Sequence, residues 1–259
     1  MVQNPSPTSS QAPRKPPYAG GLVTGAFSIS FLLATLLTAF SPRLFSGQFG
    51  AAISALMTPQ VINDPSAPVA RQAIRIGIVS GHWGNQDDSG AVCSNGTTEV
   101  DVNYNIAMLV RQDLERLGYT VDLLQEFDPR LSGYSAAVLV SIHNDTCADL
   151  GPAASGYKVA AAVGSRDPNL SDRLVACLGN RYGETTGLAY HPASITADMT
   201  GYHAFDEVDP TTTSAIIETG FMFMDYDILT QHPDLVAQGV VKGILCFLNN
   251  ENVEQTPTP

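Results

Sequence analysis

The sequence predicts a single α/β domain of three layers, with a mostly parallel central sheet flanked by helices. Short apolar runs typical of buried strands alternate with longer segments in which apolar residues recur at helical spacing. Polar residues capable of chemistry stand at the ends of several of these runs. Because parallel sheets bind ligands beyond the carboxyl ends of their strands, we expect a functional site at that edge.

The expected elements fill residues 73–250. A first strand at 74–79 precedes a helix that begins at Glu99, keeps its apolar residues three or four positions apart, and stops at Gly118. The elements expected after this helix are strands at 120–124, 136–142 and 157–163, a helix around 169–183, a strand at 214–217 and a helix around 234–248.

The N-terminal part of the chain has a different character. Residues 1–20 are predicted to be a disordered cytoplasmic tail, and the uncharged run 21–40 is long enough to cross a bilayer as a helix. We expect this run to be a transmembrane anchor, with a cleaved signal segment as the alternative. In either case the remainder of the chain is exported, and it comprises a linker at 41–72, the domain, and a disordered tail at 251–259.

Composition limits the possible partners. The chain of 259 residues is 44% hydrophobic and carries a net charge of −12 with only 13 Lys and Arg residues. Nucleic-acid binding needs clustered basic side chains, so we expect no nucleic-acid partner. The acidic surface indicates solubility, and we expect a monomeric domain.

Four cysteines stand without a C-x-x-C spacing, which argues against a thiolate metal site. In an exported domain disulfides are plausible, and we expect Cys93 to pair with Cys147 and Cys177 with Cys246. Four free buried thiols are the alternative.

Four residues form a candidate site. His82 and His143 each directly follow a strand-like run, Glu99 opens a helix, and Glu218 follows another strand-like run. Two imidazoles and one carboxylate suit a catalytic Zn²⁺ ion that keeps one coordination position open for water. Glu218 would then carry a proton during hydrolysis.

Each of these residues also has a purely structural explanation. A lone histidine at a strand end is more often a hydrogen-bonded structural residue, and Glu99 could simply interact with the helix dipole. Glu218 could pair with a Lys or Arg. Their joint placement at one edge of the predicted sheet favours the site. Asp87 and Asp88 could orient a ligand histidine, and His203 could contact substrate or be structural.

The segments around these residues, Val79–Gly84, Thr98–Glu99, Val140–Asn144 and Ile217–Phe221, resemble the zinc-dependent N-acetylmuramoyl-L-alanine amidases of the Amidase_3 family. The similarity covers residues 74–248 in the family's order. The chain departs from the common pattern at Trp83 and at Asn144-Asp145. It also has no clear equivalent of the arginine often found shortly before the last strand.

The resemblance implies that His82, Glu99 and His143 bind one Zn²⁺ ion and that Glu218 is the catalytic carboxylate. The implied reaction is hydrolysis of the amide between N-acetylmuramic acid and L-alanine in peptidoglycan. This substrate lies outside the bacterial cytoplasmic membrane, as the export prediction requires. The domain would act anchored on the outer face of that membrane, or secreted or periplasmic if residues 21–40 are cleaved.

Two other functions are compatible with the same residues. A zinc carboxypeptidase or other peptidase acting on the stem peptide would use the same metal chemistry. A non-catalytic cell-wall binding domain would keep the fold and bind no zinc. The products released from peptidoglycan and the zinc content distinguish these possibilities.

Overall fold

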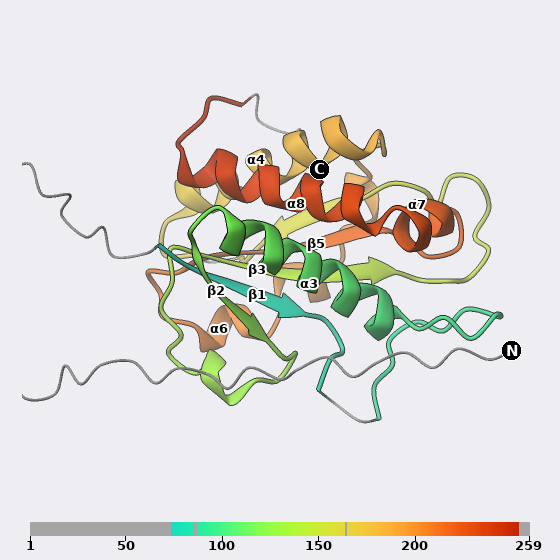
Figure 1. The fold of residues 1–259 in the computed structure, drawn as a ribbon, viewed down its shortest axis with the longest axis horizontal. Helices are drawn as coiled ribbons and strands as arrows, with labels where there is room; N and C mark the ends of the chain where they lie inside the picture. The colour runs from blue at the N-terminus through green and yellow to red at the C-terminus, as the bar shows by residue number, and fades with distance from the viewer. Residues whose placement is uncertain (1–73, 85–86, 164, 254–259) are drawn as a thin grey trace, which may run out of the picture. The chain divides into compact units, whose positions relative to one another are not determined.

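The structure is a computed structural model that describes residues 74–84, 87–163 and 165–253. Its centre is a five-stranded sheet in the order β2-β1-β3-β5-β4 (Figure 1). The strands are β1 (Arg75–Ser80), β2 (Thr120–Leu124), β3 (Val138–Asp145), β4 (Lys158–Ala161) and β5 (Thr213–Phe221). The helices are α3 (Glu99–Arg116), α4 (Pro168–Thr186), α5 (Ala197–Thr200), α6 (Ala204–Glu207), α7 (Tyr226–Gln231) and α8 (Pro233–Leu248), with short 3₁₀ turns at Pro129–Leu131 and Pro192–Ser194.

The sheet is parallel except for one edge strand. β1 pairs in parallel with both β2 and β3, and β3 pairs in parallel with β5. β4 runs antiparallel to β5. The predicted α/β domain with a mostly parallel sheet is therefore confirmed. Its consequence is that β2, β1, β3 and β5 all end at the same edge.

The two faces of the sheet are covered unequally. Helices α3, α4 and α8 pack on one face, where Ile142 and Ile217 belong to the larger core (Figure 1). The 3₁₀ turn at Pro129–Leu131 and the short helices α5 and α6 cover the other face, where Leu139 and Ile216 belong to a smaller core. Because successive side chains along β3 and β5 point to opposite faces of the sheet, both strands contribute residues to both cores.

Helices α4 and α8 lie against each other at close range. A side chain added at Gly243 would overlap the Leu178 backbone, and one added at Gly239 would overlap Tyr182. The disulfide Cys177–Cys246 joins the same two helices. The expected pairing of these cysteines is therefore confirmed, as is Cys93–Cys147, and no cysteine is free.

Two strands extend beyond their predicted ends. β3 continues to Asp145 and β5 to Phe221, so His143 and Glu218 lie inside strands and do not follow them. The physical reason is that the two strands keep pairing past their apolar runs, with His143 opposite Glu218. The fourth strand, expected at 157–163, is shorter than predicted and ends at Ala161.

The expected membrane segment at 21–40 lies outside the described residues, as do the tail at 1–20, the linker at 41–72 and most of the tail at 251–259. Within the part of the chain that the structure describes, no helix is both long and apolar enough to cross a membrane.

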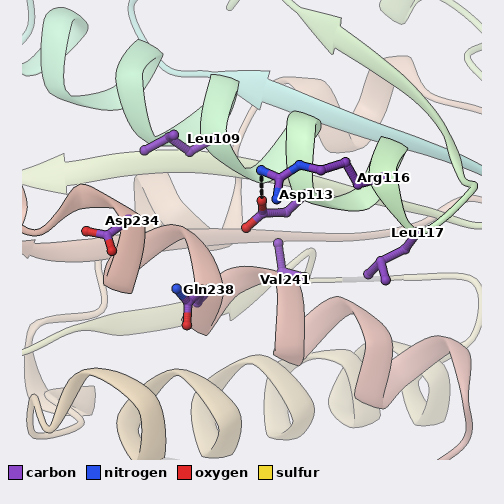
Figure 2. A pocket seen from close by; sticks show the side chains of 7 residues that line it. All are labelled: Leu109, Asp113, Arg116, Leu117, Asp234, Gln238 and Val241. Carbon is purple, nitrogen blue, oxygen red and sulfur yellow. Dashed lines mark ion pairs between the residues drawn. The ribbon is translucent and has the colours of Figure 1, made fainter.

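A groove follows the seam between α3 and α8 (Figure 2). Asp113 and Arg116 form an ion pair of 2.5 Å on its α3 side. Asp113 lies roughly 21 Å along α3 from Glu99, at about 1.5 Å per residue, so the groove is remote from the start of that helix. The lining residues are Leu109, Asp113, Arg116, Leu117, Asp234, Gln238 and Val241.

We expect Gly243→Ala to destabilise the domain by about 1–3 kcal/mol, because the new methyl group must push α8 away from Leu178. Thermal and urea unfolding monitored by circular dichroism would measure the change. Gln238→Ala, on the exposed side of the same helix, is the control and should change stability little. Equal stability of the two variants would contradict the close α4–α8 packing.

Candidate metal centre

The candidate site lies at the carboxyl edge of the sheet. Register places His143 of β3 beside Glu218 of β5, and Glu218 beside Lys158 of β4. Gly81, directly after β1, donates its N–H to the carbonyl of Ile142. A side chain at Gly81 would overlap the His143 ring, so a glycine is required there. Because Gly81 has no side chain, the end of β1 leaves room for the His143 imidazole.

His82 stands in an unusual backbone conformation. Its φ of 62° lies in the left-handed region, which costs a residue other than glycine on the order of 1 kcal/mol. Its backbone N–H donates to Glu126 Oε2 over 2.8 Å. The turn after β1 thus aims the His82 ring toward the start of α3, where its Nε2 lies 3.2 Å from Glu99 Oε1.

Glu99 is the first residue of α3, and Thr98 caps the helix by accepting the N–H of Asp101. The carboxylate is buried and held by three donors: the side-chain amide of Asn103, the N–H of Asn144 and the N–H of Ala91. Burial raises the pKa of Glu99, but hydrogen bonds from His143 and His82 outweigh it and leave that pKa well below its usual range. Glu99 is therefore more than an acidic residue in a first helical turn.

The structure brings three of the predicted residues together. One nitrogen each from His82 and His143 and one oxygen from Glu99 lie within 4.8 Å of one another. The facing atoms are His82 Nε2, Glu99 Oε1 and His143 Nδ1, which is 3.5 Å from that oxygen. Two imidazoles and a carboxylate match the donor set of catalytic zinc sites.

The second nitrogen of each imidazole also faces a carboxylate. His82 Nδ1 is 2.9 Å from Asp88 Oδ1, at ion-pair distance but not aligned for a hydrogen bond. His143 Nε2 is 3.4 Å from Glu126 Oε2. Carboxylates behind metal-binding histidines are common because they fix the ring and its tautomer. Asp88 thus lies beside a candidate metal-binding histidine, as the sequence suggested. Two histidines that each have one nitrogen facing Glu99 and the other facing a second carboxylate are an arrangement that fits a metal ion.

The protonation of His82 would oppose metal binding at its ring. The hydrogen bond to Glu99 raises the pKa of His82 to about 9 against the opposing effect of burial. A metal ion at Nε2 needs the neutral ring, so binding would release that proton.

Glu218 lies next to the donor cluster without belonging to it. Its Oε2 is buried and accepts no hydrogen bond from the described residues. Burial raises the pKa of Glu218 to about 7, although the positive charge of Lys158 and the ring of His143 oppose the shift. A carboxyl group that titrates near neutrality can both accept and donate a proton.

Lys158 is a buried cation that the sequence reasoning missed. Its Nζ donates to Asp145 Oδ2 over 2.6 Å and to the carbonyl of Ser194 over 3.2 Å. Lysine is almost never fully buried without a partner. The feature of the sequence that indicates a buried lysine is its position as a single charged residue inside the apolar run 157–163.

Glu126 was also missed, although it follows the strand at 120–124 at the same edge. It contacts the backbone of His82, the ring of His143 and the ring of His203. Burial raises its pKa, but the hydrogen bond from His203 and the nearby His143 outweigh burial and lower it.

His203 lies outside the donor cluster. Its two ring nitrogens contact Glu126 Oε1 at 3.1 Å and Glu207 Oε1 at 2.7 Å, and its ring stacks on Phe127. Of the two roles considered from sequence, these contacts favour the structural one.

The disulfide Cys93–Cys147 joins the loop before α3 to the chain just after β3. It therefore links the segment that carries Glu99 to the strand that carries His143. By restricting the unfolded chain, a disulfide typically contributes about 2–4 kcal/mol to stability.

Comparison with known proteins gives a consistent result. Residues 76–246 match the model of the Amidase_3 family, described as N-acetylmuramoyl-L-alanine amidase. No curated protein is detectably similar to the chain.

Several solved structures share the fold. An N-acetylmuramoyl-L-alanine amidase from Clostridium difficile 630 aligns with a TM-score of 0.55 at 21% identity, covering 70% of this chain and 99% of that one. One from Mycobacterium smegmatis aligns with a TM-score of 0.54 at 18% identity, covering 69% and 98%. One from Nostoc punctiforme aligns with a TM-score of 0.50 at 22% identity, covering 68% and 97%. At these identities the likeness establishes the fold.

The raised pKa of Glu218 predicts a pH-dependent stability in the metal-free protein. Between its ordinary value of 4.5 and about 7, the unfolded chain loses this proton while the folded protein keeps it. The stabilisation is therefore complete below pH 4.5 and is lost as pH rises to about 7. We expect Glu218→Gln to become progressively more stable than the unsubstituted protein across this window.

Urea unfolding from about pH 4.5 to about pH 8 in the presence of a chelator would measure the difference. Glu115→Gln, at an exposed position on α3, is the control and should show no comparable trend. A stability difference that is independent of pH for Glu218→Gln would rule out the raised pKa.

Proposed function

This chain belongs to the Amidase_3 family of N-acetylmuramoyl-L-alanine amidases and is a peptidoglycan hydrolase of that class, and we propose a role for each residue of its site. His82, Glu99 and His143 hold one Zn²⁺ ion, and Glu218 carries the proton. The bond cleaved is the amide between N-acetylmuramic acid and the L-alanine of the stem peptide.

One observation carries this assignment. The three donor atoms converge within 4.8 Å, while Glu218 lies on the neighbouring strand in register with His143, and one of its carboxyl oxygens has no hydrogen-bond partner among the described residues. The proposed proton carrier is thus separate from the proposed metal donors and lies on the strand next to that of His143. This separation is what hydrolysis with an open metal position requires.

Zinc in this site would polarise the scissile carbonyl and make water a better nucleophile near neutral pH. Glu218 accepts a proton from the attacking water and then delivers it to the departing L-alanine nitrogen. In the metal-free protein burial raises the pKa of Glu218 to about 7, so this carboxyl group holds a proton more readily than an exposed glutamate. Asp88 holds the ring of His82, and Lys158 with Asp145 balances charge beside Glu218.

The family acts on peptidoglycan, so its members work outside the cytoplasm. We propose that residues 21–40 export this domain, either as a retained anchor or as a cleaved signal segment. The uncharged composition of that run supports the proposal.

Glu218→Gln should lower amidase activity by about 10²–10⁴-fold, because the amide cannot accept or deliver the proton. Zinc content should remain at that of the unsubstituted protein, since Glu218 lies outside the donor cluster. Mass spectrometry of digested peptidoglycan would measure free, intact stem peptides. Glu115→Gln is the matched control, a Glu→Gln change on the surface of α3.

Two results would contradict this assignment. Full activity of Glu218→Gln would remove Glu218 from the chemistry. Shortened stem peptides in place of intact ones would identify the enzyme as a peptidase acting on the same polymer.

The purified protein should contain one zinc ion per chain, and a strong chelator should abolish activity until zinc is restored. His143→Ala should lose zinc, because only two of the three donors remain. Elemental analysis and activity after metal reconstitution measure both effects. A folded, wall-binding protein without zinc would instead indicate a non-catalytic binding domain.

A further inference from the structure

We infer that Glu126 is a positioning residue that holds both histidines of the metal centre in their binding geometry. This inference rests on the proposed function, since it takes zinc to be bound by His82, Glu99 and His143. It concerns a residue outside the donor set, on the loop that comes after β2.

One oxygen of Glu126 serves both histidines. Oε2 accepts the backbone N–H of His82 over 2.8 Å and lies 3.4 Å from His143 Nε2. The side chain is only 7% exposed, so water competes little for these contacts. A single buried carboxylate therefore connects the turn after β1 to the end of β3.

The orientation of His143 requires an acceptor at this place. The ring turns Nδ1 toward Glu99, which leaves Nε2 pointing away from the donor cluster. Nε2 is buried and forms no hydrogen bond within the described residues, and the carboxylate beside it is Glu126, at an ion-pair distance of 3.4 Å. A carboxylate beside it favours the tautomer with the proton on Nε2, and this tautomer leaves the Nδ1 lone pair free for a metal ion.

The contact with His82 acts on the backbone. Its left-handed conformation is unfavourable for a side chain, so it persists only where neighbouring contacts hold it. The N–H accepted by Glu126 is such a contact. Without it, the turn could relax and carry the His82 ring away from Glu99.

Glu126 is itself held in place from its other side. Its Oε1 contacts His203 Nε2 at 3.1 Å, and His203 Nδ1 contacts Glu207 at 2.7 Å. The ring of His203 stacks on Phe127 at a centroid distance of 4.4 Å. This connection places His203 two contacts away from His82 and from His143, with Glu126 between them.

Zinc affinity tests the inference independently of catalysis. Competition with a chromophoric chelator gives the dissociation constant of each variant. Glu126→Gln should weaken zinc binding by about 10–100-fold, because the neutral amide removes the negative charge beside the His143 ring and weakens the acceptor for the His82 backbone N–H. Glu126→Asp, which retains the charge on a shorter side chain, should recover part of the loss.

Asp128→Asn is the matched control. Asp128 is another buried carboxylate on the same loop, but it binds Arg130 and backbone N–H groups rather than a histidine. Its substitution should lower the unfolding temperature and leave zinc affinity unchanged. Nitrogen-15 spectra of the zinc-loaded protein should place the His143 ring proton on Nε2, and Glu126→Gln should shift that signal.

Unchanged zinc affinity in Glu126→Gln would overturn the inference. An equal loss in Asp128→Asn would also overturn it, because the effect would then come from loop stability. Failure of the proposed function looks different, since the unsubstituted protein would then bind no zinc at all.

Discussion

The parallel pairing of β1, β3 and β5 is the constraint on which the site depends. It brings the end of β1, His143 and Glu218 to one edge of the sheet, although they are far apart in sequence. Because backbone hydrogen bonds fix the register, the distance between His143 and Glu218 does not depend on loop conformation. Only Glu99 enters from a helix, and a disulfide ties its segment to the end of β3.

The sequence predicted the alternation of strands and helices well, because buried parallel strands and amphipathic helices have distinct apolar patterns. It also predicted both disulfides and the placement of His82, Glu99, His143 and Glu218 at one edge of the sheet. Those residues lay at visible junctions, where a polar side chain follows an apolar run. Their resemblance to a known family supplied roles that the spacing alone did not establish.

The sequence did not reveal the supporting residues, and the reason is physical. Glu126 lies two residues beyond its strand, and its importance comes from contacts with His82, His143 and His203 that exist only in the folded chain. Lys158 had a local signal, but its partner Asp145 lies on β3, which is separated from β4 by β5 in the sheet. Strand ends at His143 and Glu218 were misplaced for a similar reason, since pairing with a neighbour extends strands past their apolar residues.

Charge balance explains why such a site favours a cation. Glu99, Glu126 and Glu218 are largely withdrawn from water around two imidazoles, while the charge of Lys158 is already matched by Asp145. In the metal-free protein, protons compensate this acidity: His82 is more basic than usual and Glu218 less acidic. A divalent ion between His82, Glu99 and His143 would replace the proton on His82 and favour the charged form of Glu218. The buried carboxylates therefore give this edge of the sheet an excess of negative charge that a divalent cation would balance.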